Sequence, residues 1–244
     1  MNRSMRYFIE FAYKGTSYHG SQVQPNGITV QSVLQDAFFT MLRMPVELTF
    51  AGRTDAGVHA EQMFAHFDLD DTPPTAERLN RLLPEDIAVR RIYPVADDLH
   101  ARFSARRRTY EYRIAVRKSP FSYDTRTRVH VPLDYKAMNE AAKLLLGTHD
   151  FASFCKVHTD VKTTLCTVTE AYWREDDEGA VFTITADRFL RNMVRAVVGT
   201  LFEVGRHQLT SEGFADIIES RSRQAAGQSA PPQGLFLTAV RYDA

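Results

Sequence analysis

Cysteine is scarce in this sequence, and long apolar runs are absent. The two cysteines, Cys155 and Cys166, show neither Cys-x-x-Cys spacing nor a paired histidine pattern, so they indicate no zinc site and no disulfide framework. No segment approaches the roughly 18 consecutive apolar residues of a membrane span, and residues 1–10 lack the charged-then-apolar order of a signal peptide. We therefore expect a cytoplasmic protein with reduced thiols.

The chain also lacks any net charge, yet its charges are unevenly distributed. Residues 101–130 hold nine basic residues and two acids, a net charge of +7, whereas residues 47–100 hold five basic residues and eleven acids, a net charge of −6. Arginine dominates the positive segment, and its planar fork suits phosphate and stacks on bases. This basic block favours a nucleic-acid partner, with a solvated surface as the alternative; it consists of Arg102, Arg106, Arg107, Arg108, Arg113, Arg117, Lys118, Arg126 and Arg128.

The first part of the chain predicts strands and helices in alternation. Residues 6–13 alternate apolar and polar side chains, which is typical of a strand with one buried face. From Val30 to Leu42, apolar residues recur at the spacing of one helical face, and Thr29 precedes them as an N-cap. Further patterns predict strands over 46–51, 62–69 and 87–93, and a short helix over 75–83.

The second part offers a similar series of elements. We predict strands over 106–116, 164–174, 181–186 and 234–242, with helices over 134–146, 189–204 and 214–218. Residues 222–233 are rich in Gln, Ala, Ser and Pro and predict a connecting loop. The order favours an α+β fold of two related halves, 1–104 and 105–244, each a mostly antiparallel sheet with helices on one face in a split βαβ arrangement.

The most distinctive stretch runs from Phe50 to Ala60, where an apolar segment breaks into a loop between Gly52 and Gly57. Both glycines can take positive φ, so the loop can turn sharply and approach a ligand closely. Asp55 lies between them, with Arg53 two residues away. A carboxylate held in this way suits a nucleophile or a base; the alternative is an Asx-turn between two strands.

Two further candidates lie in the second half. Tyr110 is placed by the pattern near the start of a strand, where it can bury its ring edge and present a face to a pocket, whereas Tyr112 fits the core. Arg188, Arg191 and Arg195 form a stripe along the helix predicted over 189–204. Such stripes are often only solvated, but Arg195 is bracketed by valines at the edge of the apolar face, where an arginine usually has a carboxylate partner.

Several of these stretches together resemble one known family. The run from Gly52 to Ala60 (GRTDAGVHA) is similar to the signature loop of the tRNA pseudouridine synthase A family. Residues 13–24, 106–113, 188–199 and 230–237 resemble other segments of that family, in the same order. The resemblance extends from about residue 7 to residue 242, although Thr109 and residues 117–128 are less standard.

The resemblance implies a function and a role for each candidate. Asp55 corresponds to the catalytic aspartate, which acts on the sugar, and Arg195 to the arginine that pairs with it across a cleft between the halves. Tyr110 corresponds to the tyrosine that stacks on the target uracil, and Arg53 would fill the space left by the extruded base. The family's substrates are uridines 38, 39 and 40 of the tRNA anticodon stem-loop, and its members are homodimers without cofactor or metal. The loop over 13–24 is implied to lie near the cleft.

Three alternatives remain open from the residues themselves. Asp55 could serve a nucleoside or glycoside hydrolase, or the chain could be a non-catalytic RNA-binding module. A metal hydrolase using Asp55, His59 and His66 is the weakest, because His66 lies on an alternating strand with no third ligand at helical spacing.

Overall fold

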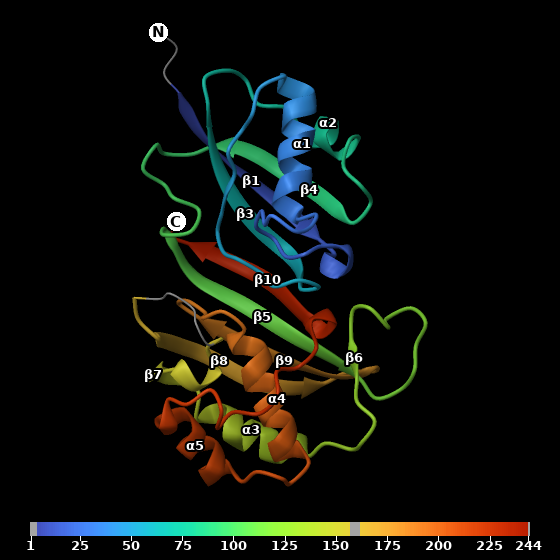
Figure 1. The fold of residues 1–244 in the computed structure, drawn as a ribbon, viewed down its shortest axis with the longest axis vertical. Helices are drawn as coiled ribbons and strands as arrows, with labels where there is room; N and C mark the ends of the chain where they lie inside the picture. The colour runs from blue at the N-terminus through green and yellow to red at the C-terminus, as the bar shows by residue number, and fades with distance from the viewer. Residues whose placement is uncertain (1–3, 157–161, 244) are drawn as a thin grey trace. The chain divides into compact units, whose positions relative to one another are not determined.

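The computed structural model describes residues 4–156 and 162–243, and the chain divides into two compact units (Figure 1). Unit 1 consists of Met1–Arg106 together with Leu237–Ala244, and unit 2 is Arg107–Phe236. The division differs from the predicted one because the C-terminal strand residues group with the first unit. The structure confirms an α+β fold in which most strand pairs are antiparallel.

Unit 1 contains four main strands in the order β4-β1-β3-β10. These are β1 (Met5–Tyr13), β3 (His59–Leu69), β4 (Ile87–Pro94) and β10 (Leu235–Tyr242), and the short β2 (Thr49–Phe50) pairs with β3. β1 lies antiparallel to both β3 and β4. The strand predicted over 46–51 is thus reduced to two residues, while the other predicted strands of this unit are present.

The helices of unit 1 form where capping and apolar spacing agree. In α1 (Val30–Leu42), the Thr29 hydroxyl accepts a hydrogen bond from the Ser32 N–H while the Ser32 side chain accepts one from the Thr29 N–H, a reciprocal cap. The helix buries one face, and Phe38 packs edge-on against Phe67 of β3 with ring centroids 5.0 Å apart. α2 (Ala76–Asn80) follows Thr75, whose hydroxyl caps it.

Unit 2 contains strands in the order β5-β9-β8-β7, all paired antiparallel. These are β5 (Ala105–Ala115), β7 (Gly147–Asp150), β8 (Leu165–Glu175) and β9 (Gly179–Ala186). The two-residue β6 (Thr127–Arg128) runs parallel to the end of β5. Every residue of β9 is buried, as expected of a strand paired on both sides beneath packed helices. Neither β6 nor β7 was predicted from the sequence.

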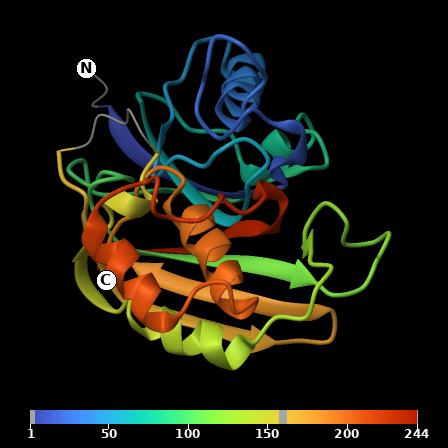
Figure 2. The same cartoon turned by 60° about the horizontal axis from the view of Figure 1, so that its bottom comes forward.

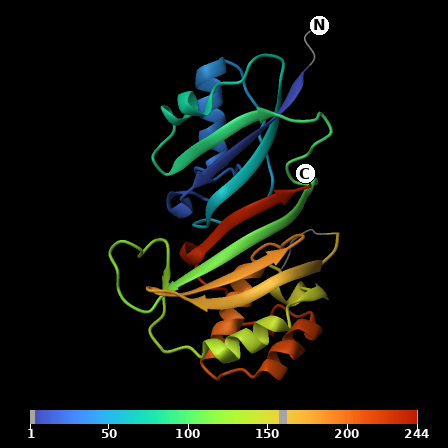
Figure 3. The ribbon, with the colours of Figure 1, turned by 180° about the vertical axis from the view of Figure 1, so that it is seen from behind.

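Three helices of unit 2 pack against one another: α3 (Tyr135–Lys143), α4 (Met193–Gly205) and α5 (Ser211–Ser220). Figures 1 and 3 view them from opposite sides, and both show them grouped beside the strands. The predicted helix over 189–204 begins later than expected because Asn192 adopts a left-handed conformation, with φ 67°, directly before α4. Among the described residues, no helix combines the length and the apolar character needed to cross a bilayer.

Candidate active site

Asp55 lies on the loop between β2 and β3 of unit 1 and is half-buried. The loop leaves the sheet at Ala51, whose N–H donates to the Phe64 carbonyl over 2.7 Å. It returns at Val58, whose N–H donates to the carbonyl of Asp55 itself over 3.2 Å. The aspartate therefore sits on a tight turn that the bond from Val58 to Asp55 closes and that the bond from Ala51 to Phe64 joins to β3.

A second loop of unit 1, residues 14–24, packs against this turn. The Thr54 N–H donates to the Ser21 hydroxyl over 2.8 Å, and the Ser21 N–H donates to the Thr54 carbonyl over 3.2 Å. Gly57 donates its N–H to the Tyr18 carbonyl. Below them, the hydroxyls of Tyr13 and Thr54 lie 2.8 Å apart in a buried hydrogen bond. The backbone on both sides of Asp55 is thus held by direct bonds, which limits how far its carboxylate can move.

Glycine is required at two points of this contact: at Gly57, which the sequence indicated, and at Gly20, which was not singled out from the sequence. Gly57 has φ 79°, and Gly20 has φ 96° with its missing Cβ position only 2.8 Å from the Thr54 carbonyl oxygen. Gly52 does not use the positive φ that its sequence position would allow, and no atom lies within 4 Å of its Cβ position. The sharp turn is made at Gly57, so Gly52 leaves open space above the loop backbone.

Tyr110 lies in the middle of β5 in unit 2, opposite Ile184 of β9. The prediction that it stands at the start of its strand was wrong, because β5 begins at Ala105, before the tyrosine-rich segment. Its ring is half-buried and meets Phe189 edge to face, with centroids 5.0 Å apart. By contrast, Tyr112 is fully buried as predicted, and its hydroxyl donates to the Pro231 carbonyl.

Arg195 projects from the first turn of α4, also in unit 2. Its Nε donates to the Ala230 carbonyl over 2.7 Å, and the Ala230 N–H donates to the Arg195 carbonyl over 2.9 Å. The predicted helical stripe of three arginines was wrong, because Arg188 and Arg191 precede the left-handed Asn192 and are not on the helix. Of the three arginines, Arg195 lies on α4, and the Ala230 carbonyl helps to orient its guanidinium.

The segment that supplies this carbonyl, residues 222–233, was predicted to be a connecting loop, and it proves to be closely packed on α4. Asn192 Nδ2 and a guanidinium nitrogen of Arg223 both donate to the Ser229 hydroxyl, over 2.6 and 2.9 Å. The Cβ position of Gly199 lies 1.7 Å from the Gln228 carbonyl oxygen, so only glycine permits the approach. No local pattern reveals this support, since its contacts join residues about 30 positions apart.

Arg53 is exposed on the Asp55 loop, and much of the basic block proves to be engaged within its own unit. Arg113 pairs with Glu111, Arg106 with Asp243, and Arg126 with Asp176, each with a closest approach of 2.6 Å. In the ranges the structure describes, Arg107, Arg117, Lys118 and Arg128 are exposed and form no ion pair. The free cations are therefore fewer than the sequence suggested.

The two histidines of the metal-hydrolase alternative are both buried and both bonded to backbone. His59 accepts a hydrogen bond at Nδ1 from the Gly15 N–H over 2.9 Å, and His66 accepts one at Nδ1 from the Ala101 N–H over 3.2 Å. Burial, together with the nearby charges of His100 and Arg6, lowers the pKa of His66 to about 4. Within residues 4–156 and 162–243, no three His, Cys, Asp or Glu side chains gather as a metal site would require.

Comparison with known proteins identifies relatives along almost the whole chain. A family model described as tRNA pseudouridine synthase matches residues 141–243. The tRNA pseudouridine synthase A of Bacteroides fragilis is 55% identical over 242 residues, covering 97% of this chain and 96% of that protein. The synthase A of Parabacteroides distasonis is 52% identical, covering 97% of this chain and 96% of that protein. That of Bacillus licheniformis is 40% identical and covers 98% of this chain and 100% of its own length. With this identity over nearly its full length, the chain belongs to the tRNA pseudouridine synthase A family of isomerases, which convert uridine to pseudouridine in tRNA.

Proposed function

We propose that this enzyme isomerises uridines 38, 39 and 40 in the anticodon stem-loop of tRNA, with Asp55 as its catalytic residue. The observation that supports this role is the setting of Asp55, a half-buried carboxylate on a turn whose backbone is bonded on both sides by a second loop. Preorganised groups of this kind hold a reacting atom in place without reorganisation during the reaction.

The reaction requires one carboxylate from the protein to act on the sugar. The bond from N1 of uracil to C1′ of the ribose breaks, the base rotates while bound, and a bond from C5 to C1′ forms. The proton on C5 is lost and N1 gains one, so the change is an isomerisation with no water consumed. A hydrolytic glycosidase needs a second carboxyl group to activate water, whereas here Asp55 acts alone on the sugar, as nucleophile at C1′ or base at C2′.

The other candidates have supporting roles in this proposal. Arg195 would pair with Asp55 across a cleft between two related halves, and its bond to the Ala230 carbonyl suits a guanidinium that must present its terminal nitrogens in one direction. Tyr110 would stack on the uracil and assist proton movement at C5. Arg53 would occupy the place of the base that leaves the stack, which costs a few kcal/mol. We propose a cytoplasmic homodimer that needs neither cofactor nor metal.

The central test replaces Asp55 with asparagine, which keeps the shape of the side chain and removes its charge. We expect Asp55→Asn to lower the isomerisation rate by at least about 1,000-fold while tRNA affinity stays within a few-fold, because one group supplies the covalent or proton-transfer step. Pseudouridine in a tRNA transcript is quantified after nuclease digestion, and affinity by equilibrium binding. Retained turnover in this variant would falsify the assignment of Asp55.

The same digests separate the alternative functions. A nucleoside or glycoside hydrolase releases free uracil, whereas an isomerase leaves all of the base attached as pseudouridine. A non-catalytic RNA-binding module yields neither product. Mapping the modified positions on bulk tRNA incubated with the wild-type protein tests the assignment to positions 38, 39 and 40. Modification confined to other positions contradicts it.

A further inference from the structure

Residues 116–126 of unit 2 form a loop that joins β5 to β6, here called the aromatic loop. Figures 1 and 2 show it in green, projecting away from the rest of the unit. Asp55, Tyr110, Arg195 and Arg53 all lie outside it. The loop therefore has no role in the proposed chemistry.

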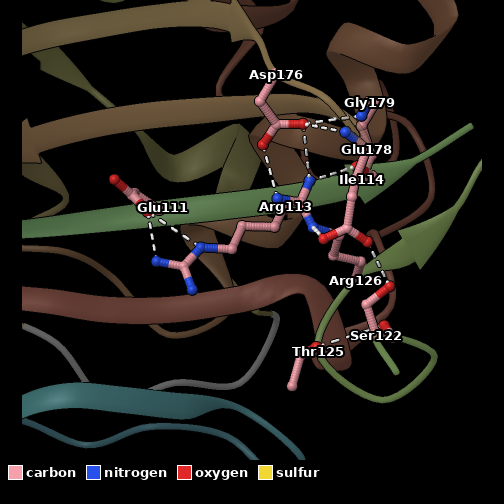
Figure 4. Close-up of polar contacts among 9 residues, drawn as sticks. All are labelled: Glu111, Arg113, Ile114, Ser122, Thr125, Arg126, Asp176, Glu178 and Gly179. Atoms are coloured by element: carbon pink, nitrogen blue, oxygen red, sulfur yellow. Dashed lines mark hydrogen bonds and ion pairs between the residues drawn. The ribbon is translucent and has the colours of Figure 1, made fainter. Parts of the chain in front are cut away.

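The base of the aromatic loop, here called its neck, is fixed by a partly buried ion pair between Arg126 and Asp176. Arg126 donates to both carboxylate oxygens of Asp176, over 2.6 and 3.2 Å, and to the Ile114 carbonyl over 2.9 Å (Figure 4). Its Nε also lies 3.5 Å from a carboxylate oxygen of Glu178. Although burial acts to raise the pKa of Asp176, hydrogen bonds from Arg126 and from the Gly179 N–H lower it overall. A forked arginine contact of this kind constrains orientation as well as distance.

The chain within the loop is also fixed, through Ser122. This residue is only 8% exposed, and its hydroxyl donates to Glu178 over 2.6 Å. Its carbonyl accepts hydrogen bonds from the N–H groups of Thr125 and Arg126, over 3.2 and 2.9 Å. The loop is therefore built around an inward-facing serine, and bonds within the chain hold its shape.

The two residues that flank Ser122 face solvent. Phe121 is 94% exposed and Tyr123 is 73% exposed. Large rings contribute little to a fold when they are left in water, and a fixed loop that presents two of them to solvent is typical of a binding surface. The backbone that carries the rings is held by the bonds of Ser122 and its neighbours, so binding would cost little backbone ordering entropy.

The charges beside these rings favour a nucleic acid. Arg117 and Lys118 stand exposed on the strand-side limb of the loop and are free of ion pairs within the described chain. Of the acids around the loop, Asp176 and Glu178 are engaged by Arg126 and Ser122, whereas Asp124 lies on the loop itself and Asp177 is exposed beside it. Exposed aromatic faces next to unpaired cations are the chemistry that binds unpaired nucleotides, with rings stacking on bases and cations contacting phosphates.

We propose that the aromatic loop is a second contact for the substrate tRNA, which binds unpaired nucleotides other than the reacting uridine. Phe121 and Tyr123 stack on bases, and Arg117 and Lys118 contact the adjoining phosphates. This inference rests on the proposed function, because it takes tRNA as the substrate. It adds a binding site that contributes to affinity and not to the chemical step.

The test is the double variant Phe121→Ser/Tyr123→Ser, measured by equilibrium binding to an unmodified tRNA transcript at several salt concentrations. We expect affinity to fall at least about tenfold, because each base–aromatic stack contributes a factor of about 5 to 150. The slope of affinity against salt should stay unchanged. In Arg117→Gln/Lys118→Gln, the slope should instead decrease by about 2, one for each lost phosphate contact. At saturating tRNA, the single-turnover rate of both variants should remain within twofold of wild type.

Tyr172→Ser is the matched control, since Tyr172 is also an exposed tyrosine of unit 2, at 45% exposure. Unchanged affinity in the aromatic double variant overturns the proposal, as does an equal loss in the control. Sedimentation of each variant identifies the alternative partner: if the double variant dissociates an oligomer, the loop joins two copies of the chain and the proposal is overturned. If wild type forms no pseudouridine yet binds tRNA through this loop, the proposed function fails and the binding surface stands.

Discussion

The Asp55 loop of unit 1 and the aromatic loop of unit 2 are both fixed at their bases, but by different interactions. Around Asp55, neutral backbone and hydroxyl groups bond to one another, and glycine backbones fit closely. At the neck of the aromatic loop, a charged guanidinium bridges carboxylates that are partly exposed. Neutral bonds and steric fit are insensitive to salt, whereas partly exposed ion pairs are screened by it. The difference separates a loop built to hold one carboxylate still from a loop built to present rings.

The largest effect is expected from disturbing the fit around Asp55. In Gly15→Ala, the added Cβ would lie 1.9 Å from the Val58 carbonyl oxygen, so the backbone of one loop must move. We expect a loss of about 3 kcal/mol in the free energy of unfolding, which thermal unfolding records as a decrease in Tm of roughly 6–12 °C. Gly52→Ala is the matched control, because no atom lies within 4 Å of its Cβ position; its Tm should change by about 2 °C or less. Equal losses in the two variants would show that close packing is not what fixes this loop.

A smaller effect is expected when the neck of the aromatic loop is broken. Arg126→Gln leaves Asp176 without its cation, and the side chain of Arg126 is only 14% exposed, so we expect a cost of about 2 kcal/mol, somewhat below that of a fully buried pair. The amide hydrogens of Val116 and Arg126 bond to the Glu178 and Ser122 carbonyls. If the variant opens the loop locally, their exchange with solvent should accelerate about 30-fold.

The control for this variant is Arg81→Gln, which removes an exposed ion pair with Glu77 on one helical surface. Exposed pairs of this type contribute about 0.5 kcal/mol or less, so its effect on stability should be near zero. High salt should reduce the difference in stability between wild type and Arg126→Gln. The difference in stability between wild type and Gly15→Ala should stay unchanged. If the loss of stability in Arg126→Gln does not depend on salt, ion pairing is not what fixes the neck.

The two loops also differ in how much of them could be predicted from the sequence. The Asp55 loop could be located from the sequence, because its glycines, its acid and the strands around it are adjacent in the chain, and the Thr29 cap and the core position of Tyr112 were predicted on the same kind of local pattern. Its bonds to the loop over 14–24, such as that between Thr54 and Ser21, could not be predicted in this way. The neck of the aromatic loop depends on Arg126 meeting Asp176, 50 positions away. No periodicity encodes such a pairing, so the sequence showed only an excess of arginine.

The environment of Arg195 was missed for a related reason. Asparagine tolerates the left-handed conformation at little cost, but whether it adopts that conformation depends on partners elsewhere, here Ser229. The apolar spacing of residues 189–204 therefore predicted a helix that starts four residues too early. Short sequence motifs supplied the candidates Asp55, Tyr110 and Arg195. The bonds that orient Arg195 join residues far apart in the chain, so only the folded structure shows them.

The smallest effect is expected from a modest decrease in pH, which should destabilise unit 1 before it affects unit 2. His66 of unit 1 has a pKa of about 4 in the fold, lowered by burial and by neighbouring positive charge, against about 6.5 in an unfolded chain. Between these values the unfolded state binds the proton more readily, so the stability of unit 1 should decrease as pH falls from about 6.5 towards 4. His100 acts in the same direction, because its pKa is also lowered by burial.

For Asp176 at the neck, the charged form stabilises the fold, because the pKa of its carboxyl is lowered there. For His66, by contrast, the neutral form does so. That contribution is complete above the ordinary aspartate pKa of about 3.9 and is lost only below it. At pH 5, hydrogen exchange should therefore accelerate among the strands around His66 while the amides of Val116 and Arg126 keep their protection. His66→Asn should flatten the decline in unit 1, whereas His207→Asn, which changes an exposed histidine, should leave it unchanged. Loss of protection at the neck before unit 1 is affected would contradict both assignments.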